Sequence, residues 1–360
     1  MTGPSRRNSV LRTLALAVAG LLLFAGLVAW VGLENVKGHL AAADTTLLAF
    51  AALLFFSQIL TMGGRWWIAM RLLGIDASLL AVIRANCGSN FVNFYAPGHF
   101  GEPMMAVWLG RTRGAPGVEA FTVLIACKVV ATVMNLGLLL FCLPFLAGAG
   151  DASLLWQVGA TIVFICLGTA LGVFVVIHRA TAEALGLLVV RLSVEIVRRI
   201  RPESADKVER AVTKVFARFT ETFALFARHP PTLVAVAAMS ALKMGTIIGV
   251  VMLLYRAFGV PVSWFGATFL ETVDVLGHLV SIWIPGNMGI QEWIMTTAAS
   301  VGLNIDESVA ASAAIAHKGI LLVHITLGGL LFAGLGVFVR KEMQDSSQAA
   351  KEPECLAPGS

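Results

Sequence analysis

The sequence predicts an all-α polytopic integral membrane protein with about six full spans and two re-entrant hairpins, arranged as an inverted-topology repeat. Hydrophobic residues make up 58% of the 360 residues and charged residues only 13%, about half the charged share of a typical soluble domain. A Pro-Gly-x-x-Gly motif interrupts an apolar stretch in each half of the chain. The net charge of +5 is therefore interpreted by its placement around membrane segments, and it does not indicate a nucleic-acid partner.

Six apolar runs are predicted to cross the membrane, because about 20 apolar helical residues span the hydrocarbon core. The first run follows three arginines and lacks a clear small-residue cleavage site, so we expect it to remain as a span. The predicted spans cover residues 10–33, 47–62 (ending at Arg65), 118–147, 154–177, 232–255 and 309–339.

Two further apolar stretches, 79–110 and 264–300, are predicted as re-entrant hairpins because proline and glycine interrupt them. Proline lacks a backbone donor and glycine adopts angles that other residues avoid, so a continuous helix is disfavoured. Backbone groups freed at membrane depth need protein or water as partners, so we expect a polar site at each break. The structural hairpin residues are Pro97, Gly98, Gly101, Pro285, Gly286 and Gly289.

The two breaks indicate an internal repeat. An offset of 188 residues relates the Pro-Gly motifs, and an offset of 190 relates Glu102 to Glu292 and Lys128 to Lys318. The alternative is a chance match, since Pro-Gly turns are common. Three predicted spans separate the hairpins, and an odd number places them on opposite faces, as in the inverted repeats of many secondary transporters.

The predicted domains are a first membrane half (1–178), a linker (179–229), a second membrane half (230–340) and a polar tail (341–360) that we expect to be disordered. Apolar residues at helical spacing predict amphipathic helices in the linker, lying on the cytoplasmic membrane surface. A solvated connection between the halves is the alternative. Of the 26 Lys and Arg residues, 20 lie on one side of this layout, which predicts a plasma (inner) membrane protein with both termini cytoplasmic.

Ionisable residues inside the membrane are the candidate functional residues, because each is costly unless paired or hydrated. Four basic and four acidic residues lie in the predicted membrane segments: Arg84, Glu102, Lys128, Lys243, Glu271, Asp274, Glu292 and Lys318. The candidate substrate-binding residues are Glu102, Lys128, Glu292, Lys318, Arg84, Asn90 and Asp274.

Glu102 and Glu292 each begin a short helix after a break, where the helix dipole favours a carboxylate. One interpretation makes them helix caps, or partners of Lys318 and Lys128 that hold the two repeats together. The other places lysines and helix N-termini around a phosphate headgroup. His278, His317 and His324 are interpreted either as a proton relay or as hydrogen-bonded core residues.

The sequence contains no nucleotide-binding loop, no metalloprotease motif and no nucleophile elbow. The five cysteines show neither CxxC spacing nor a nearby histidine array. We therefore expect no metal and no cofactor.

The ordered pair of motifs resembles the flippase-like transmembrane family, which is the membrane region of lysylphosphatidylglycerol synthases and also occurs as a stand-alone protein. The resemblance covers about residues 10–340 and includes Lys128 and Lys318, where arginine is expected. The second motif departs from the family pattern at Asn287, where glycine is usual, and at Gln291, where arginine is common. The matching motifs are Pro97-Gly98-x-x-Gly101-Glu102 and Pro285-Gly286-x-x-Gly289-x-x-Glu292.

The resemblance implies movement of a phospholipid or lipid-linked substrate between leaflets. Full-length synthases also carry a soluble aminoacyltransferase domain, for which this sequence leaves no length, so we expect a transporter and not an enzyme. The alternatives are a non-transporting partner of a membrane lipid- or glycan-modifying enzyme, and a lipid-modifying enzyme of the synthase type. The lipid, the direction and the oligomeric state stay open at this point.

Overall fold

The computed structural model describes residues 6–72, 74–96, 100–113, 117–146, 205–281 and 283–349, together with 191, 194 and 195. The predicted fourth span, the linker up to residue 204 and the tail beyond 349 lie outside these residues, apart from the three isolated positions. Pro97, Gly98 and His99 also lie outside them.

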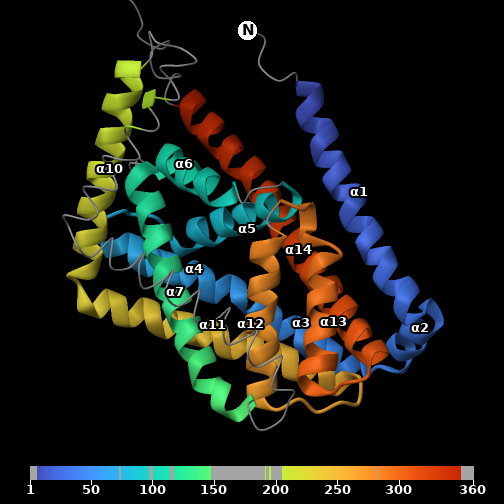
Figure 1. Cartoon of the computed structure of the whole chain (residues 1–360). Helices are drawn as coiled ribbons and strands as arrows, with labels where there is room; N and C mark the ends of the chain where they lie inside the picture. Colours follow the sequence, from blue (N-terminus) through green and yellow to red (C-terminus); the bar gives the residue numbers. More distant parts are fainter. Residues whose placement is uncertain are drawn as a thin grey trace, which may run out of the picture.

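Every element in the described part of the chain is helical, which confirms the predicted fold class (Figure 1). In Figure 1, α1 lies along one flank of the molecule and α10 along the opposite flank. The elements are α1 (Arg6–Val31), α2 (Leu33–Ala42), α3 (Thr45–Phe56), α4 (Gln58–Leu72), α5 (Leu79–Tyr95), α6 (Gly101–Arg113), α7 (Gly117–Leu146), α10 (Ala205–Ala227), α11 (Pro230–Ala257), α12 (Trp264–Val280), the short 3₁₀ turn η2 (Pro285–Asn287), α13 (Ile290–Leu303) and α14 (Glu307–Ala349).

Five membrane-crossing segments occur among the described residues, and each coincides with a span predicted from the sequence. Each is long and apolar enough to cross the hydrocarbon core. The segments are Leu14–Val31, Thr45–Leu72, Val118–Asn135, Pro230–Ala257 and Glu307–Ala333.

Two predicted boundaries were wrong. The second span continues from Thr45 to Leu72 through α3 and α4, so Arg65 lies inside the helix, where it is buried, and does not end the span. α14 continues to Ala349, beyond the boundary at 340 where we expected the disordered tail to begin.

The predicted interruptions are present as pairs of short antiparallel arms, α5 with α6 and α12 with α13. Gly101 permits the close approach of α6 to α5, because a Cβ there would lie 2.0 Å from the Ser89 carbonyl oxygen. In the second break, Gly286 and Gly289 have φ angles of 70° and 84°, which favour glycine. Asn287 has a φ of 50°, a conformation that asparagine tolerates better than most residues.

The helices of the two halves pack reciprocally. The first-half arm α5 packs on the second-half span α14, and the second-half arm α12 packs on the first-half span α7. The spans before the hairpins, α4 and α11, contact each other directly. A pseudo-two-fold repeat predicts this reciprocal packing. The prediction that the second half is inverted depends on an odd number of spans between the hairpins, and one of these, the fourth span, lies outside the described residues.

The described part of the linker is attached to the membrane region. α10 packs against α7, and the Arg218 Nη1 atom lies 2.7 Å from the Glu119 Oε1 atom. Exposed positions on α10 are largely polar, including Asp206, Glu209 and Lys214. α10 is therefore docked on the first half, which argues against a freely solvated connection along this helix.

Candidate functional site

Each half contains one glutamate–lysine ion pair at equivalent positions of the repeat. The Lys128 Nζ atom lies 2.6 Å from the Glu102 Oε1 atom, and the Lys318 Nζ atom lies 3.0 Å from the Glu292 Oε1 atom. Both pairs form within a half, between the arm after the break and the following long helix. The interpretation that these charges hold the two repeats together was therefore wrong.

The second-half pair is closed. The Lys318 ammonium donates to the Gly286 carbonyl oxygen at 3.0 Å and to the Gln291 side-chain oxygen, and its side chain is only 5% exposed. The Gly289 backbone N–H donates to Glu292 Oε2 at 2.6 Å, so this carboxylate caps α13. The ammonium thus makes two hydrogen bonds and one ion pair within the half, and these contacts stabilise the break.

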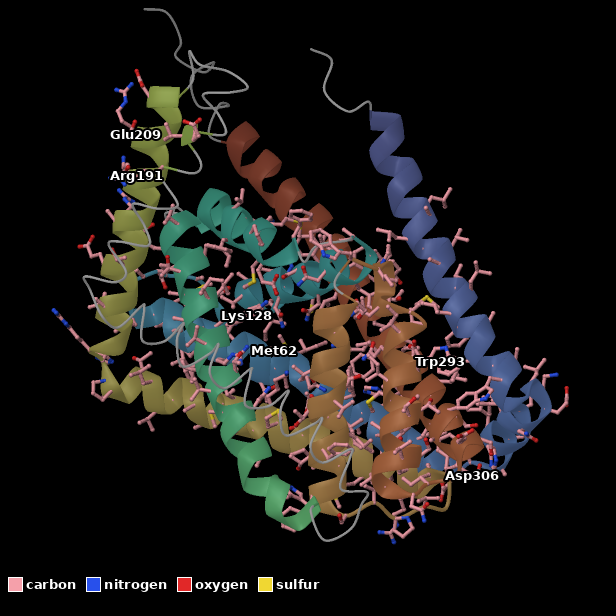
Figure 2. All side chains as sticks on the ribbon, in the orientation of Figure 1. Met62, Lys128, Arg191, Glu209, Trp293 and Asp306 are labelled. Carbon is pink, nitrogen blue, oxygen red and sulfur yellow. The ribbon has the colours of Figure 1, made fainter. Side chains whose placement is uncertain are left out.

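The first-half pair is open. Lys128 lies within the membrane segment Val118–Asn135, in the middle of the helix bundle (Figure 2), yet its side chain is 45% exposed. Glu102 lies in the first turn of α6, whose first backbone N–H, at Gly101, donates to the Asn93 side-chain oxygen at 2.6 Å. Lys128 therefore keeps one strong counter-ion and an accessible surface for another anion.

Asp274 is connected to the closed pair through Gln291. The Gln291 side-chain nitrogen donates to Asp274 Oδ1, while its oxygen accepts from Lys318. The His278 Nδ1 atom lies 3.4 Å from Asp274 Oδ2. These contacts join α12, α13 and α14 by one buried chain of polar side chains.

Arg65 and Lys243 are site residues that the sequence analysis undervalued. Arg65 donates to the Ser240 hydroxyl at 3.3 Å, which joins α4 to α11. Lys243 lies one turn further along α11 and interacts electrostatically with Glu271, Asp274, Arg65 and Lys128. The signal for Arg65 was the apolar sequence Trp-Trp-Ile-Ala-Met that follows it directly.

Arg84 and Asn90 lie on α5 in different surroundings. The Arg84 guanidinium donates to the Phe332 carbonyl oxygen at 3.5 Å and lies 6.0 Å from the centre of the Trp108 ring. These contacts connect α5 to α14 and differ from those of the two ion pairs. Asn90 donates to the Asn86 side-chain oxygen at 3.3 Å.

The two breaks lie next to each other. The Phe94 ring at the end of α5 would be 3.2 Å from a Cβ at Gly286, and the Lys318 ammonium lies 5.9 Å from the centre of the same ring. Within the described residues, no group of three or more His, Cys, Asp or Glu side chains could hold a metal ion. The site is thus a set of paired charges at two adjacent helix breaks.

Comparison with known proteins identifies the family of this chain. The model of the family described as lysylphosphatidylglycerol synthase TM region matches residues 16–329, which include both breaks and both ion pairs. A UPF0104 membrane protein of Methanothermobacter thermautotrophicus is 24% identical over 310 residues, which cover 84% of this chain and 89% of that protein. The chain is therefore a multi-pass membrane protein that belongs to the lysylphosphatidylglycerol synthase transmembrane-region family.

Proposed function

We propose that this protein moves a phospholipid, or another lipid with an anionic headgroup, between the leaflets of the plasma (inner) membrane. The observation that carries the proposal is the open ion pair of Glu102 and Lys128. A charged side chain inside a membrane span is costly, and such residues usually mark an ion or substrate path. The half-exposed Lys128 side chain fits this pattern.

The charge balance of the membrane region favours an anionic ligand. Lys128 lies within electrostatic reach of Lys243, which in turn interacts with Arg65. Away from the outer ends of the membrane segments, the described helices carry five basic and four acidic side chains: Arg65, Arg84, Lys128, Lys243 and Lys318 against Glu102, Glu271, Asp274 and Glu292. One phosphate diester would neutralise the single excess positive charge.

The packing suggests how the headgroup would cross. α7, which carries Lys128, packs against α6 and α12, one arm of each hairpin. The headgroup would bind Lys128 between the hairpins while the acyl chains stay in lipid, and Glu102 would compete for the ammonium and so promote release. In this mechanism Lys318 holds the second break and does not bind the headgroup, because it is buried and already contacts Gly286, Gln291 and Glu292.

Lipid translocation in vesicles tests the proposal. Purified protein is reconstituted with phosphatidylglycerol or phosphatidylcholine that carries a fluorescent acyl chain, and a membrane-impermeant quencher reports the labelled lipid left in the outer leaflet. We expect faster movement of phosphatidylglycerol than of phosphatidylcholine, and a roughly tenfold slower rate for Lys128→Met, equivalent to about 1.4 kcal/mol. Glu102→Gln should also slow the movement, because the variant has no carboxylate that competes with the bound phosphate for the Lys128 ammonium.

A control substitution separates this site from general charge effects. Lys214→Gln removes a cation from the exposed face of α10, so it should leave the rate unchanged. Movement of neither lipid by folded wild-type protein would reject transport and favour a partner protein. Formation of lysylphosphatidylglycerol from lysyl-tRNA by the same preparation would instead reveal an enzyme.

A further inference from the structure

The first arms of the two hairpins carry matching side-chain pairs with different chemistry. At the offset of 188 residues that relates the two Pro-Gly motifs, Asn86 corresponds to Asp274 and Asn90 corresponds to His278. In the first half, the Asn90 amide donates to the Asn86 side-chain oxygen at 3.3 Å. In the second half, His278 Nδ1 lies 3.4 Å from Asp274 Oδ2. The fold thus places a neutral pair in one half and an ionisable pair at the equivalent place in the other.

The ionisable pair has one accessible member and one buried member. The His278 side chain is 36% exposed, whereas the Asp274 side chain is 8% exposed. Histidine is the side chain whose charge ordinarily changes between pH 5 and 8. The imidazole is therefore the more exposed member of the pair, and the carboxylate beside it is buried.

The pair is connected to the second break. Gln291 donates to Asp274 and accepts from Lys318, and Lys318 holds the Gly286 carbonyl oxygen at 3.0 Å. A positive charge on His278 would compete with the Gln291 amide for the Asp274 carboxylate. The polar chain thus connects the imidazole to the backbone of the break.

Charged groups from the neighbouring helices surround the pair and set its electrostatic environment. They come from α12 itself and from the helices α7, α11, α13 and α14. The groups that interact with Asp274 or His278 are Glu271 on α12, Lys243 on α11, and His317 and Lys318 on α14, while Lys128 on α7 acts on Lys243 and Glu292 on α13 acts on His317.

We propose that Asp274 and His278 form a proton-binding site that couples lipid movement to a proton gradient. His278 takes one proton from water on the accessible side, is stabilised as an imidazolium by Asp274, and releases that proton on the other side after the repeats have moved. The inference rests on the proposed lipid movement for its coupling, but proton movement can be measured separately.

The first half supplies the sequence of the decisive variant. Asp274→Asn together with His278→Asn reproduces the neutral pair of Asn86 and Asn90, which this fold already accommodates at the equivalent place. Vesicles that contain wild-type protein, fluorescent phosphatidylglycerol and the pH indicator pyranine are given a gradient of one pH unit. We expect the rate of lipid movement to change at least threefold relative to equal pH on both sides, together with protein-dependent proton entry. The double variant should lose both the gradient response and the protein-dependent proton entry.

Each outcome has a separate meaning. If the pH gradient does not change the rate of lipid movement by wild-type protein, the proposed proton coupling is wrong and the lipid transport function stands. Proton entry that depends on Asp274 and His278 without any lipid movement supports the proton site and overturns the phospholipid proposal.

Two further variants keep the test independent of folding. His278→Gln should remove the gradient response even if the double variant does not fold. His324→Gln removes another membrane histidine, whose ring contacts Phe55 and Phe56, and should keep the response. Loss of the response in both histidine variants would show that the effect is not specific to the pair.

Discussion

Lys128 and Lys318 occupy equivalent places in the repeat, yet their ammonium groups have different surroundings. Lys318 contacts a carboxylate, an amide oxygen and a backbone carbonyl oxygen, whereas Lys128 forms an ion pair with Glu102 and has a half-exposed side chain. The two equivalent lysines therefore differ in their partners and in their exposure. One holds a helix break in place, and we propose that the other meets the substrate.

This difference predicts unequal stability effects. Lys318→Met leaves the Glu292 carboxylate buried without its cation, so we expect a loss of about 3–5 kcal/mol in unfolding free energy, as for other broken buried ion pairs. Lys128→Met removes a cation whose side chain is 45% exposed and leaves Glu102, which is 10% exposed, without it, so we expect a smaller loss of about 1–3 kcal/mol. Denaturant unfolding of both variants in the same detergent measures the comparison. Equal losses would contradict the distinction between a closed and an open pair.

At the scale of single elements, polar caps and glycines decide where helices begin. Ser78 caps α5 and Ser263 caps α12 through their hydroxyl oxygens, and Asp44 caps α3. Before α14, the Asp306 carboxylate accepts hydrogen bonds from the Ser308 backbone and hydroxyl. Each cap satisfies backbone donors that have no partner within the helix.

The cap of α14 predicts a pH dependence outside the membrane. The hydrogen bond from the Ser308 hydroxyl is the main reason why the pKa of Asp306 is lowered. Because the folded pKa is the lower one, the stabilisation is complete above the unfolded value of about 3.9 and is lost as pH falls through the folded pKa. Asp306→Ala should cost about 1 kcal/mol at pH 7, and the difference from wild type should start to shrink as the pH falls below about 4.

Thermal unfolding in detergent between pH 3 and pH 7 measures this dependence. Asp306→Asn is the matched control, because it keeps an acceptor oxygen but cannot be protonated in this range. Its stability relative to the alanine variant should not change with pH. A constant difference between wild type and the alanine variant would show that the carboxylate charge does not contribute.

At the scale of the whole molecule, the contact of α5 with α14 connects the two halves. Gly88 and Gly329 lie in this contact, where Cβ atoms would meet the Phe332 and Phe91 rings at 2.8 Å and 2.3 Å. Small residues of this kind let membrane helices approach closely. The reciprocal contact of α12 with α7 completes the connection, so movement of one half must change the packing of the other.

Two adjacent glycines on α14 test this contact. Gly329→Ala should destabilise the protein by about 1–3 kcal/mol through overpacking, because the Phe91 ring has to move. Gly328→Ala places its Cβ at an ordinary 3.5 Å from Cys87 and gains the same helix propensity, so it should be neutral or slightly stabilising. Unfolding midpoints of the two variants give the comparison, and similar midpoints would exclude tight packing at Gly329.

The sequence by itself determined the fold class, the places of the two breaks and most of the buried charges. It also determined five of the six predicted spans, and the sixth lies outside the described residues. These features follow from local physics: apolar length decides what crosses a membrane, and proline and glycine decide where a helix stops. The motif order alone also indicated the repeat. Asn287 shows the same local logic, since asparagine tolerates the left-handed conformation that it adopts there.

Only the tertiary structure decided which charges meet. The sequence predicted that Arg65 ends a span, but Arg65 is buried and donates to Ser240. The sequence also predicted equivalent roles for Lys128 and Lys318, but these lysines differ in accessibility. The physical reason is that burial and pairing depend on side chains from helices far apart in sequence. In a low-dielectric interior, a neighbour a few ångströms away decides whether a charge stabilises the fold or stays available for a ligand.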